Sequence, residues 1–103
     1  MFAVIFKAQI RELDHTYHET AARLRELAMG QYGCVEFMSF TEGDQEISIS
    51  YWKTQTQIDL WRKNAAHLET QALGKSKWYK SYHIEVVQVI RQYRYPTSPE
   101  SVT

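Results

Sequence analysis

Polar side chains of the types that do chemistry occur in the segment "WRKNAAHLETQALGKSKWY", which begins at Trp61. Asn64, His67 and Gln71 are three and four residues apart, the spacing that places side chains on one face of a helix. Of the three, only His67 accepts or donates a proton near neutral pH. Trp61 precedes this polar row and Trp78 follows it. Polar groups between apolar walls are typical of a small-molecule pocket, so the pattern suggests a binding cleft.

A purely structural role competes with this interpretation. A histidine on the shoulder of an amphipathic helix is usually a partly exposed, hydrogen-bonded residue, and tryptophans more often fill a core than bind a ligand. The polar row is rotated by one residue, about 100°, from an apolar row on the same helix. That apolar row consists of Ile58, Trp61, Ala65, Leu68 and Ala72. The polar row therefore borders the core side of the helix, and the sequence leaves both interpretations open.

The elements that position these residues follow from hydrophobic periodicity. Alternation predicts a strand at residues 2–10, and a helix capped by Asp14 ends at Gly30 or Gly33. The remaining elements are strands at 34–40, 45–52 and 81–93, a hairpin connection at 41–44 and a helix at 55–73. The order β-α-β-β-α-β predicts an α+β, ferredoxin-like fold, a four-stranded antiparallel sheet with two helices on one face.

The chain is expected to form one domain over residues 1–95, since 103 residues support a single core. The segment "PTSPESVT", residues 96–103, holds both prolines, and we expect it to be disordered.

The predicted strands are apolar on both faces, whereas two helices cover only one face. Leaving the other face in water would be costly at roughly 25 cal/mol per Å² of apolar area. The sequence therefore predicts a homodimer that packs sheet against sheet.

Composition argues against several other functions. Twelve basic and twelve acidic residues give a net charge of zero, which disfavours nucleic-acid binding. Cys34 is the one cysteine, so an intrachain disulfide is excluded and we expect a small buried residue there. His15 and His18 lack the further ligands of a metal site, and no metal is expected. Without a signal peptide or an apolar run near ~20 residues, a membrane role is not expected and the cytoplasm is the default compartment.

The second half of the chain resembles the antibiotic biosynthesis monooxygenase (ABM) domain family. The resemblance lies in the "YW" that closes the strand at 45–52, the helix with Trp61, His67 and Gln71, the "GKSKWY" segment, and the last strand "VVQVIRQY". It covers most of residues 1–95, the first half mainly in pattern. The family fold is a dimeric α+β barrel, which agrees with the homodimer predicted above.

The resemblance implies a cofactor-independent monooxygenase. Such an enzyme oxidises a small aromatic phenol or quinol with dioxygen, because the deprotonated substrate itself supplies the electrons. The pocket would lie between the helix at 55–73 and the sheet, and it needs a proton acceptor and hydrogen bonds for the anion. The resemblance implies His67 as the base or hydrogen-bond partner, Asn64 as the anion stabiliser, Trp61 and Trp52 as walls, and Gln71 and Trp78 as further substrate-binding residues.

Other functions need the same cavity, and the sequence does not distinguish them from a monooxygenase. A dimeric binding or stress-associated protein would hold a small hydrophobic molecule without turnover, and an isomerase would transfer a proton without oxygen. Haem binding or degradation is a further alternative, although the chain departs from that pattern. Phe6 and Lys7 stand where the haem-degrading members have an Asn, and Gln71 stands where their ligating His is expected.

Overall fold

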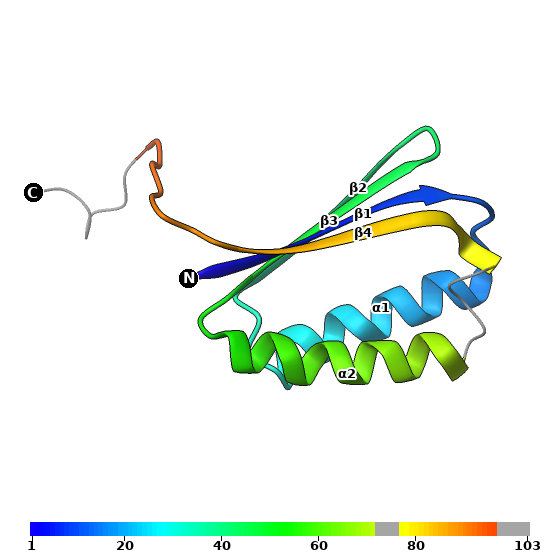
Figure 1. Ribbon diagram of the computed structural model, residues 1–103, viewed down its shortest axis with the longest axis horizontal. Coiled ribbons are helices and arrows are strands. Elements are labelled where there is room, and N and C mark those ends of the chain that lie inside the picture. The colour runs from blue at the N-terminus through cyan, green and yellow to red at the C-terminus, as the bar shows by residue number, and fades with distance from the viewer. Residues whose placement is uncertain (72–76, 97–103) are drawn as a thin grey trace, which may run out of the picture.

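The computed structural model describes residues 1–71 and 77–96 (Figure 1). Its elements occur in the predicted β-α-β-β-α-β order, which confirms the ferredoxin-like fold. They are β1 (Phe2–Ile10), α1 (His15–Gly30), β2 (Glu36–Glu42), β3 (Gln45–Trp52), α2 (Gln55–Gln71) and β4 (Tyr79–Gln88).

The four strands form one antiparallel sheet in the order β2-β3-β1-β4. Both helices lie on the same face of this sheet (Figure 1). The strand register determines which side chains meet the helices, because successive side chains point to opposite faces. Val4 lies opposite Ser50, and Ala8 lies opposite Glu46. Val4 and Ala8 are 5% and 3% exposed, so the even-numbered positions of β1 belong to the helix-facing side.

The core is built mainly from tryptophan and aliphatic side chains between the sheet and the helices. Trp52 and Ile58 are fully buried, and Trp61 and Ala65 of the predicted apolar row are also buried. Leu68 of that row is half-buried, and Ala72 lies outside the described residues. The predicted periodicity of the second helix is therefore confirmed over the part that the structure describes.

Asp14 connects the start of α1 to the start of β4. Its Oδ1 accepts the backbone N–H of Tyr17 at 2.8 Å, as expected for a helix N-cap, and the indole N–H of Trp78 at 3.1 Å. Its Oδ2 lies 2.7 Å from the Lys77 ammonium. The hydrogen bond from Lys77, followed by that from Tyr17, lowers the pKa of Asp14 from 3.8 to about 2.

Replacing Asp14 by Asn tests this ionic connection. The amide keeps an acceptor for the Tyr17 N–H but loses the charge that faces Lys77. Because the folded-state pKa is lowered, the ionic contribution is present above 3.8 and disappears as the pH falls towards 2. We expect Asp14→Asn to melt a few degrees lower at neutral pH, and thermal unfolding should show this deficit shrinking between pH 4 and pH 2. A pH-independent deficit would contradict the assignment.

Two predicted strands have different bounds in the structure. The second strand covers Glu36–Glu42 rather than 34–40, and the last strand covers Tyr79–Gln88 rather than 81–93. Gln88, the last residue of β4, pairs with Phe2, the first residue of β1, and the Val89 N–H donates to the Met1 carbonyl at 3.0 Å. The following residues, through 96, extend away from the sheet (Figure 1). Of the tail expected to be disordered, residues 97–103 lie outside the described residues.

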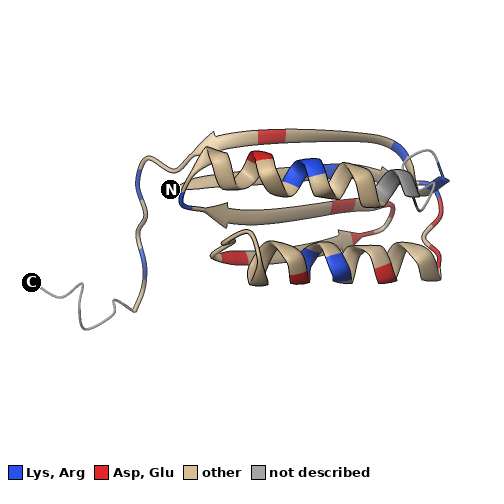
Figure 2. Cartoon of the chain, turned by 90° about the horizontal axis from the view of Figure 1, so that it is seen from below, with Lys and Arg blue, Asp and Glu red and all other residues tan. Residues whose placement is uncertain are grey.

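The sheet face opposite the helices is apolar at its centre. Ile5, Ile49 and Met38 lie side by side across β1, β3 and β2. On the same face Phe40 is 62% exposed and Ile47 is 40% exposed. We call these five residues the outer face. On the helices, by contrast, basic and acidic residues are interspersed (Figure 2). None of the described helices is long and apolar enough to span a membrane.

Candidate functional site

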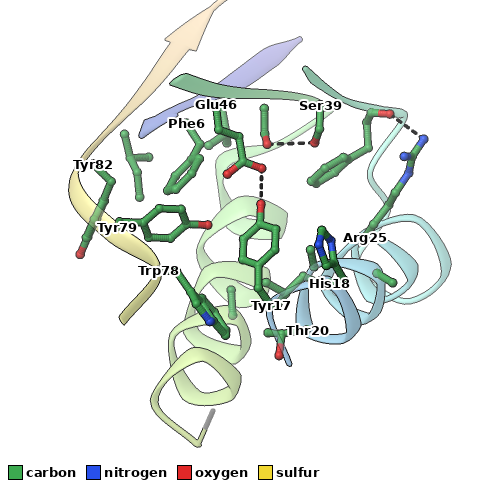
Figure 3. A pocket seen from close by; sticks show the side chains of 18 of the residues that line it. Phe6, Tyr17, His18, Thr20, Arg25, Ser39, Glu46, Trp78, Tyr79 and Tyr82 are labelled. Atoms are coloured by element: carbon green, nitrogen blue, oxygen red, sulfur yellow. Dashed lines mark hydrogen bonds between the residues drawn. The ribbon is translucent and has the colours of Figure 1, made fainter. Parts of the chain in front are cut away.

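A cavity of about 460 Å³ lies between the two helices and the helix-facing side of the sheet. All four strands and both helices contribute to its lining, which is mostly apolar and aromatic (Figure 3). The cavity is within the size range of small-molecule sites, and its few polar side chains fall into a central pair and a polar side.

The central pair consists of Glu46 and Tyr17. Glu46 lies on β3 opposite Ala8 and Thr41, so its side chain points toward the helices and is 7% exposed. Tyr17 reaches it from the first turn of α1, and the phenol donates a hydrogen bond to Glu46 Oε1 (Figure 3). Burial, followed by this hydrogen bond, raises the pKa of Tyr17 well above its usual value of 10.0. Tyr17 is therefore a hydrogen-bond donor over the whole neutral range.

The second oxygen of this carboxylate has no such donor. Glu46 Oε2 is buried and has no hydrogen-bond partner within the described part of the chain. A buried acceptor without a donor costs free energy, and a buried carboxylate costs more than a neutral group. Because Glu46 lines the cavity, a ligand with an acidic proton or a hydroxyl group would supply the missing partner.

An aromatic wall flanks the pair on one side. It consists of Phe6, Trp78, Tyr79 and Tyr82 (Figure 3). The ring centroid of Phe6 lies 5.4 Å from that of Tyr79 and 5.9 Å from that of Tyr82. Tyr17 meets Trp78 edge to face, with 5.3 Å between the centroids. This wall offers ring faces and edges to a flat ligand, the arrangement that aromatic pairs favour.

A polar side lies across from the aromatic wall. The hydroxyl groups of Ser39 and Ser48 share a hydrogen bond of 2.9 Å on the floor of the cavity. His18 and Arg25 face them from α1 (Figure 3). One guanidinium N–H of Arg25 donates to the carbonyl of Phe37 at 3.1 Å, and its central carbon lies 5.8 Å from the centroid of the Phe37 ring.

Comparison with known proteins identifies the family. No family model matches the chain. The uncharacterised protein YqjZ of Bacillus subtilis is 39% identical over 92 residues, which cover 88% of this chain and 81% of YqjZ. A crystal structure of a mutant of SnoaB, a cofactor-independent oxygenase from Streptomyces nogalater, superposes with a TM-score of 0.70. At 9% identity, over 88% of this chain and 94% of SnoaB, that match shows the fold alone.

A fungal relative is similar over most of this chain. The jasmonate monooxygenase ABM of Pyricularia oryzae is 31% identical over 99 residues, which cover 91% of this chain. The aligned region is 46% of the fungal protein's length, so this chain spans about half of that relative. The chain belongs to the same family as YqjZ, of which it covers 81%.

The three predicted tryptophans have different positions in the structure. Trp61 and Trp78 line the cavity, where the sequence predicted substrate-binding residues. Trp52 lies behind them: it is fully buried, its indole N–H donates to Ser50 Oγ at 2.8 Å, and its ring packs 5.3 Å from that of Trp61. Trp52 therefore supports the cavity wall from within the core and is not among the lining residues.

Asn64 and His67 of the predicted polar row of α2 do not reach the cavity. Asn64 donates to the Tyr32 hydroxyl at 3.1 Å, near the end of α1, and His67 is exposed on the outer side of α2. Neither residue lines the cavity, and the side chain of Gln71 lies outside the described part of the chain. The rotation away from the apolar row turns Asn64 towards the rim and His67 towards solvent. The catalytic roles of Asn64 and His67 stay predictions, and neither residue contacts the cavity.

Glu46 and Tyr17 are the residues that sequence reasoning missed. The signal was present in "QEISISYW", because period-two alternation places Glu46 on the same face as Ser48, Ser50 and Trp52. An acidic residue on the helix-facing side of a sheet marks a candidate site, since carboxylates are rarely buried without a partner.

Removing the Tyr17 hydroxyl tests the central pair. In Tyr17→Phe, Glu46 Oε1 loses its hydrogen bond, and we expect the free energy of unfolding to fall by about 1–3 kcal/mol. Tyr32→Phe is a matched control, because it deletes the phenol that accepts from Asn64 at the partly buried rim. Urea denaturation should show the smaller loss for Tyr32→Phe. Equal losses would mean that the Tyr17–Glu46 hydrogen bond contributes no more to stability than the Asn64–Tyr32 hydrogen bond.

Proposed function

We propose that this ABM domain is a cofactor-independent monooxygenase that oxidises a small aromatic phenol or quinol in the cavity. The observation that carries the proposal is the Glu46 carboxylate, which is buried against aromatic rings with one oxygen unpartnered among the described residues. A general base must lie within hydrogen-bond reach of the proton it removes, and a ligand inside the cavity meets that condition at Glu46.

The chemistry is that of a substrate which is its own reductant. For an anthrone, Glu46 takes one proton from the CH₂ group, and the resulting anion passes electrons to dioxygen. A carbon–oxygen bond forms, giving a peroxide. The oxygen–oxygen bond then breaks as the second proton leaves, so that anthrone and O₂ yield the quinone and one water. Tyr17 holds the carboxylate in place, and the aromatic wall excludes water from the anion.

An isotope experiment tests this function. The purified protein, with a chelator and without added cofactor, is incubated with anthrones, naphthols and quinols under ¹⁸O₂. The proposal predicts oxygen uptake above the buffer rate and one ¹⁸O atom in each product molecule, measured by mass spectrometry. A ligand that binds tightly but shows no uptake would instead favour the binding-protein alternative, and turnover under nitrogen would favour an isomerase.

We further propose that two copies associate through the outer face. Its apolar residues are those that a second sheet would cover, and a stable interface buries about 800 Å² on each partner. Lys7, His83 and Glu85 form a polar cluster on the same side of the sheet, with Glu85 3.7 Å from Lys7 and 3.0 Å from His83. An apolar centre beside a polar margin is the usual anatomy of a protein interface.

A further inference from the structure

The cavity is electrically asymmetric, and this asymmetry bears on which ligands it accepts. Among the described lining residues Glu46 is the one acidic side chain, whereas His18, Arg25 and Arg62 are basic. None of the ion pairs among the described residues involves Arg25. No carboxylate of the described residues therefore lies within ion-pair distance of its guanidinium.

Arg25 is nevertheless held in a defined position. The Phe37 carbonyl accepts one of its five N–H donors, and the Phe37 ring lies beneath the guanidinium. Such anchoring reduces the entropy that is lost when the remaining donors bind a planar anion. In the hydrogen bond between Ser39 and Ser48, on the floor of the same side, one hydroxyl donates and the other accepts, so the accepting hydroxyl is an additional donor.

The spacing along the sheet sets the size of the ligand. Ser48 lies two residues from Glu46 on β3, and Phe37 pairs with Ser50, which lies four residues from Glu46. At about 3.3 Å per residue, the polar side is roughly 7–13 Å from the central carboxylate. A bicyclic aromatic ring system has about this length.

We propose that the cavity is selective for aromatic hydroxy acids, with the ring system between Glu46 and the polar side and the carboxylate bound by Arg25 and the Ser39–Ser48 pair. The hydroxyl or acidic C–H group then meets Glu46 at the opposite end. This inference rests on the proposed function only in using the same cavity, because it concerns binding and needs no oxygen.

Matched ligands test the selectivity. We compare 6-hydroxy-2-naphthoic acid with its methyl ester under nitrogen, following binding by calorimetry. Wild type should bind the acid at least about tenfold more tightly than the ester. This is the difference in affinity expected when one charge-assisted contact is lost. Arg25→Gln should reduce the ratio to near one, and Arg25→Lys should restore part of it.

Arg23→Gln is the control variant, because Arg23 is exposed on the same helix and does not line the cavity. It should keep the wild-type ratio, which separates a local contact from the loss of one positive charge. Equal affinity for acid and ester, no binding of the acid, or the same loss in Arg23→Gln would overturn the inference. Oxygen uptake is measured separately, so an acid preference without uptake would support the selectivity and refute the monooxygenase.

Discussion

Glu46→Gln is expected to lower the turnover number for oxygen uptake by about 10²–10⁴-fold, the range that a general base contributes. Glutamine keeps the shape of the side chain and an oxygen that accepts the Tyr17 hydrogen bond, but its amide does not take the substrate proton. We therefore expect the loss in kcat, with KM changed little. Steady-state oxygen electrode measurements on the best substrate of the panel give both constants.

His67→Ala is the matched control for this prediction. Because His67 is exposed on α2 and outside the cavity lining, its removal should leave kcat within about twofold of wild type. Circular dichroism and thermal unfolding establish that both variants are folded. If His67→Ala abolishes uptake while Glu46→Gln retains it, the base is on α2 and the cavity assignment is wrong.

Two charges on the outer face are expected to convert a dimer into a monomer. Phe40→Glu with Ile47→Glu lowers the stability of the isolated chain only modestly: both side chains are already substantially exposed, although the two carboxylates repel each other across β2 and β3. In a sheet-to-sheet dimer the same charges would be buried without partners on both copies, which costs several kcal/mol for each ion. Light scattering at micromolar concentration should give twice 12.2 kDa for wild type and 12.2 kDa for the variant.

Leu60→Glu is the control for the interface. Leu60 is 51% exposed on α2, away from the sheet, so a charge there should leave the mass unchanged. A wild-type mass of 12.2 kDa would contradict the dimer directly. A double variant that stays dimeric would place the interface elsewhere on the molecule.

The sequence was sufficient for the fold because each element has a strong local signal. Alternation located β1 at its observed bounds, and the Asp14 cap fixed the start of α1. The end of β4 was missed because it depends on pairing with β1. The residue pattern of a single segment carries no information about pairing with another strand.

The candidate site was harder to predict because it depends on which face each side chain occupies. The polar row of α2 differs from the core row by about 100°, and that rotation separates the cavity from solvent. Alternation alone places Glu46 on the helix-facing side, but its contact with Tyr17, far away in the sequence, follows only from the folded structure. Trp61 and Trp78 were found because large aromatic residues on the core side line whatever cavity the core leaves.

Proton removal by Glu46 is the central claim, and hydrogen–deuterium exchange measures it without oxygen. Anthrone is incubated with the protein in D₂O under nitrogen, and NMR follows deuterium entering its CH₂ group. The account predicts exchange above the buffer rate with wild type and with His67→Ala, and exchange at the buffer rate with Glu46→Gln. Wild-type exchange that persists in Glu46→Gln, or no exchange of bound anthrone by wild type, would contradict it.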